Sequence, residues 1–81
     1  MSNNLMKYIM FGDMPVIFDS RMSHSEISET LLKNPYLKLR EPSTAGFIKV
    51  DELGISVYGD SITLGLKSSP DDVEFIADLM S

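Results

Sequence analysis

The strongest constraint on this chain is a run of alternating apolar and polar residues that short turns divide into three segments. The segments are 46–50, 55–58 and 61–66, and the turns between them are 51–54 and Gly59-Asp60. Alternation at a period of two places every second side chain on the same face of a sheet. The pattern therefore predicts a three-stranded antiparallel meander. Its predicted core residues are Ile48, Val50, Ile55, Val57, Ile62, Leu64 and Leu66.

A β-hairpin is predicted near the start of the sequence. Leu5–Phe11 and Met14–Phe18 are rich in large apolar residues, and Gly12-Asp13 between them is a turn signal. Pro15 has no backbone N–H to donate to a neighbouring strand. We therefore expect the second of these strands to lie at an edge of the sheet.

A helix is predicted over residues 24–33. Ser23 is a suitable N-cap, and Glu26 three residues later completes the pattern of a capping box. Asn34-Pro35 ends the helix, because the residue before a proline avoids the α region.

A second helix is predicted to follow Ser69 and to run to the end of the sequence. Ser69 is the N-cap, Pro70 suits the first helical position, and Asp71 and Asp72 lie in the first turn, where the helix dipole favours acids. Its apolar stripe consists of Val73, Ile76, Ala77 and Met80, which Phe75 and Leu79 widen beyond a minimal core contact.

These elements predict an α+β fold in the order β-β-α-β-β-β-α, an antiparallel sheet of about five strands with two helices. A chain of 81 residues has room for one hydrophobic core. We therefore expect residues 1–81 to form a single compact domain of two or three layers.

Charge and cysteine content narrow the classes of partner and compartment. Twelve acidic and seven basic residues give a net charge of −5, which disfavours direct binding to nucleic acid. There is no cysteine, so neither a disulfide framework nor a thiolate metal site is available. The apolar runs are too short to span a bilayer, and no signal-peptide pattern is present. We expect a cytoplasmic protein with no membrane role.

The sequence predicts no catalytic residue, no metal site and no cofactor. His24 lies among serines at a helix start, but Ser23 and Glu26 are accounted for as caps. The glycines do not form a phosphate-binding string. Acidic residues in turns have the right chemistry for calcium or magnesium, but their spacing matches no metal loop. These acids are Asp13, Asp19, Asp51, Glu52, Asp60, Asp71 and Asp72.

The first strand is apolar on both of its faces, which suggests a surface for a partner. Leu5, Ile9 and Phe11 make one face, and Met6, Tyr8 and Met10 make the other. Methionine and tyrosine are enriched at protein interfaces. The candidate partner-binding residues are Met6, Tyr8, Met10, Phe47 and Tyr58. The alternative is a core on both faces of the sheet, with one helix covering each.

The later part of the sequence resembles a set of short proteins encoded by bacteriophages and prophages. The residues that carry this resemblance include Tyr58-Gly59-Asp60-Ser61, 64–68 and Pro70-Asp71-Asp72, and it extends to 14–18 and Ser23-His24. The resemblance implies no assigned activity and no catalytic residues. It does imply a context, because small acidic phage proteins are often inhibitors that bind one host protein, anti-CRISPR proteins among them.

The function we expect is that of a non-enzymatic protein-binding module of phage or prophage origin. It would act by stoichiometric contact, as an inhibitor of a host defence protein or by binding itself as a homodimer. Two alternatives stay open. One is a structural or assembly component of a virion, and the other is a small hydrolase or metal-dependent enzyme that uses His24 or the acidic turns.

Overall fold

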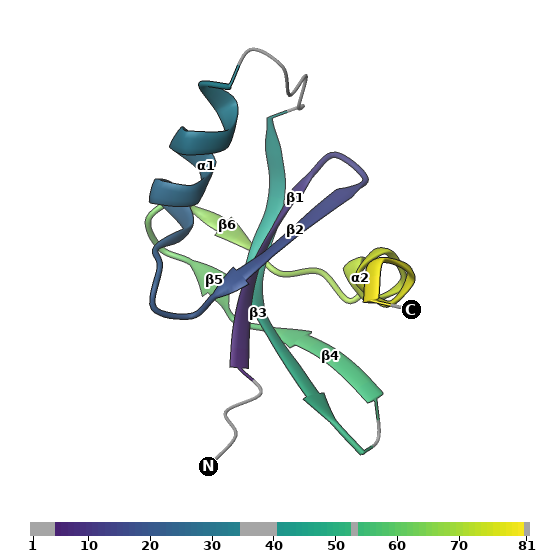
Figure 1. Ribbon diagram of the computed structural model, residues 1–81. Helices are drawn as coiled ribbons and strands as arrows, with labels where there is room; N and C mark the ends of the chain where they lie inside the picture. Colours follow the sequence, from purple (N-terminus) through teal and green to yellow (C-terminus); the bar gives the residue numbers. More distant parts are fainter. Residues whose placement is uncertain (1–4, 35–40, 53, 81) are drawn as a thin grey trace.

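The computed structural model describes residues 5–34, 41–52 and 54–80. Its described residues have an α+β fold, as predicted, and the expected helix end at Pro35 lies outside them. Figure 1 shows the elements, which are β1 (Leu5–Phe11), β2 (Met14–Asp19), α1 (His24–Leu32), β3 (Pro42–Asp51), β4 (Gly54–Tyr58), β5 (Asp60–Ser61), β6 (Leu66–Lys67) and α2 (Asp72–Met80).

Strands β1 to β4 form an antiparallel sheet in the spatial order β2-β1-β3-β4. The predicted hairpin is β1 and β2, and its turn contains Gly12 at a φ of 71°, a conformation that favours glycine. Pro15 lies on β2 at one edge of the sheet, as predicted. The other edge is β4.

Both faces of the sheet are covered, so the described residues form three layers (Figure 1). On one face, Ile76 of α2 packs against the buried Tyr8, Met10 and Ile48, and we call this the α2 face. On the other, α1 and the segment 64–66 pack against a second buried cluster, and we call this the α1 face. The buried residues of the second cluster are Ile9, Phe11, Phe18 and Ala45.

The prediction of a third meander strand over 61–66 is wrong. The chain leaves the sheet at Gly59, whose φ is 74°, and β5 and β6 form a separate two-stranded sheet. Between them is a turn in which the Gly65 N–H donates to Ser61 O at 2.8 Å and the Leu64 N–H donates to Ser61 Oγ at 3.3 Å. A hydroxyl that bonds its own backbone in this way favours a turn over a strand.

This turn separates residues that alternation alone assigned to one core. Ile62, predicted to be buried, is 91% exposed. Leu64 and Leu66 are partly buried against the cluster of the α1 face. Ile48, Val50, Ile55 and Val57 lie together on the α2 face, as the pattern of the first two strands predicts.

The cap predicted for the first helix is present, and the predicted hydrogen bond to Ser69 forms ahead of the second helix, which begins at Asp72 and not at Pro70. Ser23 Oγ accepts a hydrogen bond from the Glu26 N–H at 3.1 Å, and α1 runs from His24 to Leu32. Ser69 Oγ accepts from the Asp71 N–H at 3.3 Å before α2. The apolar arc of α2 is wider than the core requires, because Phe75 and Leu79 remain exposed on its surface.

Candidate functional site

The five residues predicted to bind a partner lie on opposite faces of the sheet. Met6 is opposite Ile48 and Tyr8 is opposite Gly46, which places Met6, Tyr8 and Met10 on the α2 face. Phe47 is opposite both Lys7 and Tyr58, on the α1 face. Directly opposed residues of antiparallel strands share a face. The prediction of one common surface is therefore wrong, because Phe47 is out of phase with the even-numbered residues of β1.

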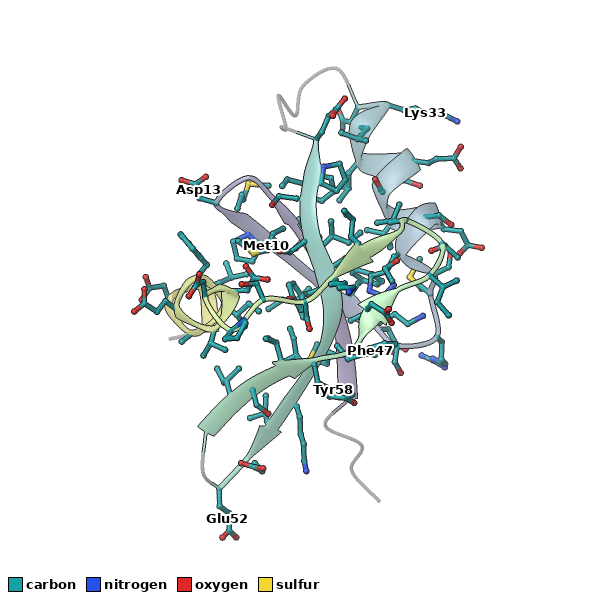
Figure 2. All side chains as sticks on the ribbon, turned by 180° about the vertical axis from the view of Figure 1, so that it is seen from behind. Met10, Asp13, Lys33, Phe47, Glu52 and Tyr58 are labelled. Carbon is teal, nitrogen blue, oxygen red and sulfur yellow. The ribbon has the colours of Figure 1, made fainter. Side chains whose placement is uncertain are left out.

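The residues on the α2 face are core residues. Tyr8 is 0% exposed and Met10 is 1% exposed, and Met6 is partly buried beside them. Figure 2 shows Met10 on the side of the sheet that carries α2. The structure thus matches the alternative of a core on both faces, and Tyr8 and Met10 are not accessible to a partner in this fold.

Asp72, the first residue of α2, anchors the helix to the sheet through one carboxylate oxygen. Its Oδ2 accepts hydrogen bonds from the Tyr8 hydroxyl at 2.6 Å, the Thr44 hydroxyl at 2.7 Å and the Ser69 N–H at 3.2 Å. The side chain is buried. Burial and the Asp72 carboxylate raise the pKa of the Tyr8 phenol well above its usual value. The phenol therefore stays a donor throughout the physiological range.

Sequence patterns predict for Asp72 only the role of an acid in the first turn of the helix. The spacing of Ser69 and Asp72 is that of a capping box, and the Ser69 N–H does bond the Asp72 side chain. A second signal was the hydroxyl of Tyr8 in an otherwise apolar strand, since a buried tyrosine needs a hydrogen-bond partner. Which residue would supply that partner depends on how α2 crosses the sheet.

On the α1 face, Phe47 is at the centre of an aromatic group. It stacks on Tyr58, with ring centroids 5.6 Å apart and an angle of 22° between the rings. The His24 ring meets Phe47 edge-on at 5.8 Å and Phe18 edge-on at 5.4 Å. Figure 2 shows Phe47, from the middle of β3, close to Tyr58 at the end of β4. Tyr58 remains 43% exposed, so the outer side of this stack faces solvent.

A surface hollow of about 290 Å³ opens beside Phe47, between the start of α1 and the turn that carries Ile62. The Lys7 ammonium lies 5.9 Å from the centre of the Phe47 ring and donates to Met22 O at 2.8 Å. The hollow is lined by Lys7, Ser23, His24, Phe47, Asp60, Ser61, Ile62 and Thr63.

We call Phe47, Tyr58 and Ile62 the hairpin patch, after the paired strands β3 and β4 that carry Phe47 and Tyr58. Phe47 and Ile62 line the same hollow, and Tyr58 extends the apolar surface from Phe47 to solvent. The sequence pattern predicts partner-binding roles for Phe47 and Tyr58 but a core position for Ile62. The turn residues Gly59 and Gly65 on either side of it were the signal that the alternating pattern is interrupted there.

His24 is held by contacts that stabilise the fold. Its Nε2 lies 2.9 Å from Gly46 O, and the ring is buried between Phe18 and Phe47. Nε2 therefore carries the proton and donates to the carbonyl. Burial lowers the pKa of His24 below its usual value, and the nearby Lys7 ammonium acts in the same direction, while the bond to Gly46 O opposes them. The arrangement favours the neutral imidazole as a structural link between α1 and β3.

We predict that stability falls when the pH drops below about 6.5, the pKa of histidine in an unfolded chain. The unfolded chain then takes up a proton that folded His24 resists, so protonation favours unfolding until the pH passes the lower pKa of the folded state. Urea denaturation between pH 7.5 and pH 5.5 measures this slope. His24→Gln, which keeps an N–H donor but does not titrate, should flatten it, and an unchanged slope would contradict the assignment.

The acidic turns do not converge on one site. Within residues 5–34, 41–52 and 54–80, no group of three or more His, Asp or Glu side chains is placed to hold a metal ion. Asp19 instead accepts hydrogen bonds from Nε and Nη2 of Arg21, each at 3.1 Å. These hydrogen bonds lower the pKa of the Asp19 carboxyl. The acids with exposed side chains include Asp13, Asp51, Glu52, Asp60 and Asp71.

Comparisons with protein-family models, with curated proteins and with solved structures find no match. In the part of the chain that the structure describes, none of the helices has the length and apolar character required to cross a membrane.

Proposed function

We propose that this chain is a non-enzymatic protein-binding module that acts by stoichiometric contact through the hairpin patch. The observation that carries the proposal is the exposure of Ile62, which projects from a hydrogen-bonded turn beside the Phe47 hollow. Burying an isoleucine side chain contributes about 1.5–3 kcal/mol, so a partner that covers Ile62 would gain a substantial part of its binding energy there.

The composition of the patch suits a protein partner. Protein interfaces typically combine an aromatic or aliphatic anchor with a polar rim. In this chain the stacked Phe47 and Tyr58 rings and Ile62 supply the apolar centre, and Lys7 and Asp60 at the hollow supply charges of both signs. The anchors need little reorganisation, because the stack and the turn are formed before any partner arrives.

The sequence resemblance favours one such function, the inhibition of a host protein. Such an inhibitor is of phage or prophage origin, acts in the cytoplasm of the host cell and covers a surface that the host protein needs for its own function. An anti-defence role is one instance of it.

The test is capture of partners from an extract of the host cell by immobilised protein, with quantitative mass spectrometry. Ile62→Asp is expected to reduce the recovery of a specific partner at least about tenfold, because an anchor is replaced by a charge that must be desolvated. Leu79→Asp makes the same change at another exposed apolar position, on α2, and should bind as the unmodified chain does.

Thermal unfolding of both variants provides the control for folding. Both sites are exposed, so each melting temperature should stay close to that of the unmodified chain. If the two variants recover the same proteins in the same amounts, the hairpin patch is not the contact surface.

A further inference from the structure

The two edges of the four-stranded sheet differ in how they resist pairing with another strand. The β2 edge contains Pro15, which lacks an N–H, and ends at the charged Asp19. The β4 edge, from Gly54 to Tyr58, contains no charged residue and no proline. Native proteins usually protect exposed edges with such residues, and an edge without them is a template for another strand.

The side chains of β4 alternate symmetrically about its central residue. Ile55 and Val57 face the α2 side and are partly buried against the cluster around Tyr8. Ser56 and Tyr58 face the opposite side and are exposed. A strand with small or apolar uncharged residues at every position can pair antiparallel with an identical strand without opposing like charges.

We propose that β4 pairs antiparallel with β4 of a second copy of this chain, about a two-fold axis at Ser56. In this register Ile55 of one copy is opposite Val57 of the other, Gly54 is opposite Tyr58, and the two Ser56 side chains meet. The apolar layer on the α2 face then continues from one core into the next. Tyr58 covers the partner's Gly54, an aromatic and glycine pairing that suits antiparallel sheets.

The ends of β4 are compatible with this pairing. Gly59, at a φ of 74°, turns the chain out of the sheet directly after Tyr58, so Asp60 belongs to β5 in the separate sheet. Glu52 lies in the turn before β4. The interface consists of two five-residue strands, so it is smaller than a standard interface and the dimer is a weak one. Each copy carries a net charge of −5, and salt should therefore strengthen association.

Sedimentation equilibrium of the full chain from about 10 to 500 µM tests the proposal, with Ser56→Glu and Ser56→Lys as register-specific variants. Each variant places two like charges opposite each other at the axis and is expected to weaken dimerisation about fivefold to tenfold. An equimolar mixture of the two places Glu opposite Lys, and should restore dimers to at least the level of the unmodified chain.

Two controls separate the pairing from general effects of charge and of folding. Thr30→Glu makes the same charge change at an exposed residue of α1, away from β4 and from the hollow, and should leave the dissociation constant unchanged. Ser56→Glu is opposite Lys49 within its own sheet, so it should not lower the melting temperature. The proposal is overturned if the unmodified chain stays monomeric throughout the range, if Ser56→Glu dimerises as well as the unmodified chain, or if the mixture fails to restore dimers. Tyr58 belongs to both β4 and the hairpin patch, but Ser56 lies outside the patch, so the Ser56 variants test the pairing separately from partner binding at Ile62.

Discussion

Asp72→Ala is expected to lower the free energy of unfolding by about 3 kcal/mol or more, a fall in melting temperature of roughly 12–24 °C. The substitution removes the acceptor of three hydrogen bonds and leaves the Tyr8 hydroxyl, the Thr44 hydroxyl and the Ser69 N–H without it. Tyr8 is fully buried, so water cannot replace the lost partner. Thermal and urea denaturation followed by circular dichroism measure the effect.

Two further variants show whether the carboxylate acts through these donors. Tyr8→Phe removes one donor and leaves Asp72 the other two, so its cost should be smaller, about 1–2 kcal/mol. Combined with Asp72→Ala it should cost less than the sum of the two single changes, because both act on the same bond. A change of less than about 0.5 kcal/mol for Asp72→Ala would mean that the carboxylate does not anchor α2.

Gly46→Ala is expected to destabilise the domain by about 2–3 kcal/mol, which corresponds to roughly 8–24 °C in melting temperature. A Cβ at this position would lie 2.8 Å from Ser68 Cβ and 2.8 Å from Tyr58 O. The second of these atoms belongs to the backbone of β4 and has little freedom to move. The same substitution disturbs the carbonyl that accepts from His24, so the link between α1 and β3 should weaken as well.

Ser68→Gly provides a matched test of the clash, because it deletes the Cβ that the new methyl group meets. Alone it should destabilise, since the Ser68 hydroxyl donates to Gly59 O at 2.7 Å. In the Gly46→Ala background it should cost less than it does alone. Strict additivity of the two changes, or a Gly46→Ala variant as stable as the unmodified chain, would show that the strand tolerates a side chain there.

Local patterns in the sequence were sufficient for the elements whose structure is decided locally. The cap at Ser23, the hydrogen bond to Ser69 ahead of α2, the hairpin with its Gly12 turn and the edge position of Pro15 all follow from single-residue chemistry, and all are present. The segment 61–66 alternates as a strand does, but Gly59 and the hydroxyl of Ser61 direct it into a turn. The alternating pattern does not show whether the segment is more stable as a strand or as a turn, because that depends on what the segment packs against.

The surface was harder to predict than the fold. Met6, Tyr8 and Met10 have the composition of an interface strip, and that composition is equally suited to a core beneath a helix. What decides between the two is the position of α2, which is fixed by the contact of Asp72 with Tyr8, 64 residues away in the sequence. Tyr58 and Phe47 remain candidates because they lie on the other face, and Ile62 joins them through a turn that no period-two pattern predicts.

Substitution by aspartate should have different effects at Tyr58 and at Tyr8. Tyr58→Asp alters the exposed side of the hairpin patch and should weaken partner binding with little loss of stability. Tyr8→Asp would place a second carboxylate beside Asp72 in the core and should unfold the domain. Loss of binding in the Tyr8→Asp variant would therefore not show that Tyr8 contacts the partner.

Photocrosslinking in the host cell tests whether the hairpin patch contacts another protein. A photoreactive phenylalanine analogue at position 62 is compared with the same analogue at position 79, which is 56% exposed on α2, the helix on the opposite face of the sheet. We predict that position 62 gives a discrete crosslinked product with another protein and that position 79 does not. A discrete product from position 79 and none from position 62 would show that the hairpin patch is not the contact surface.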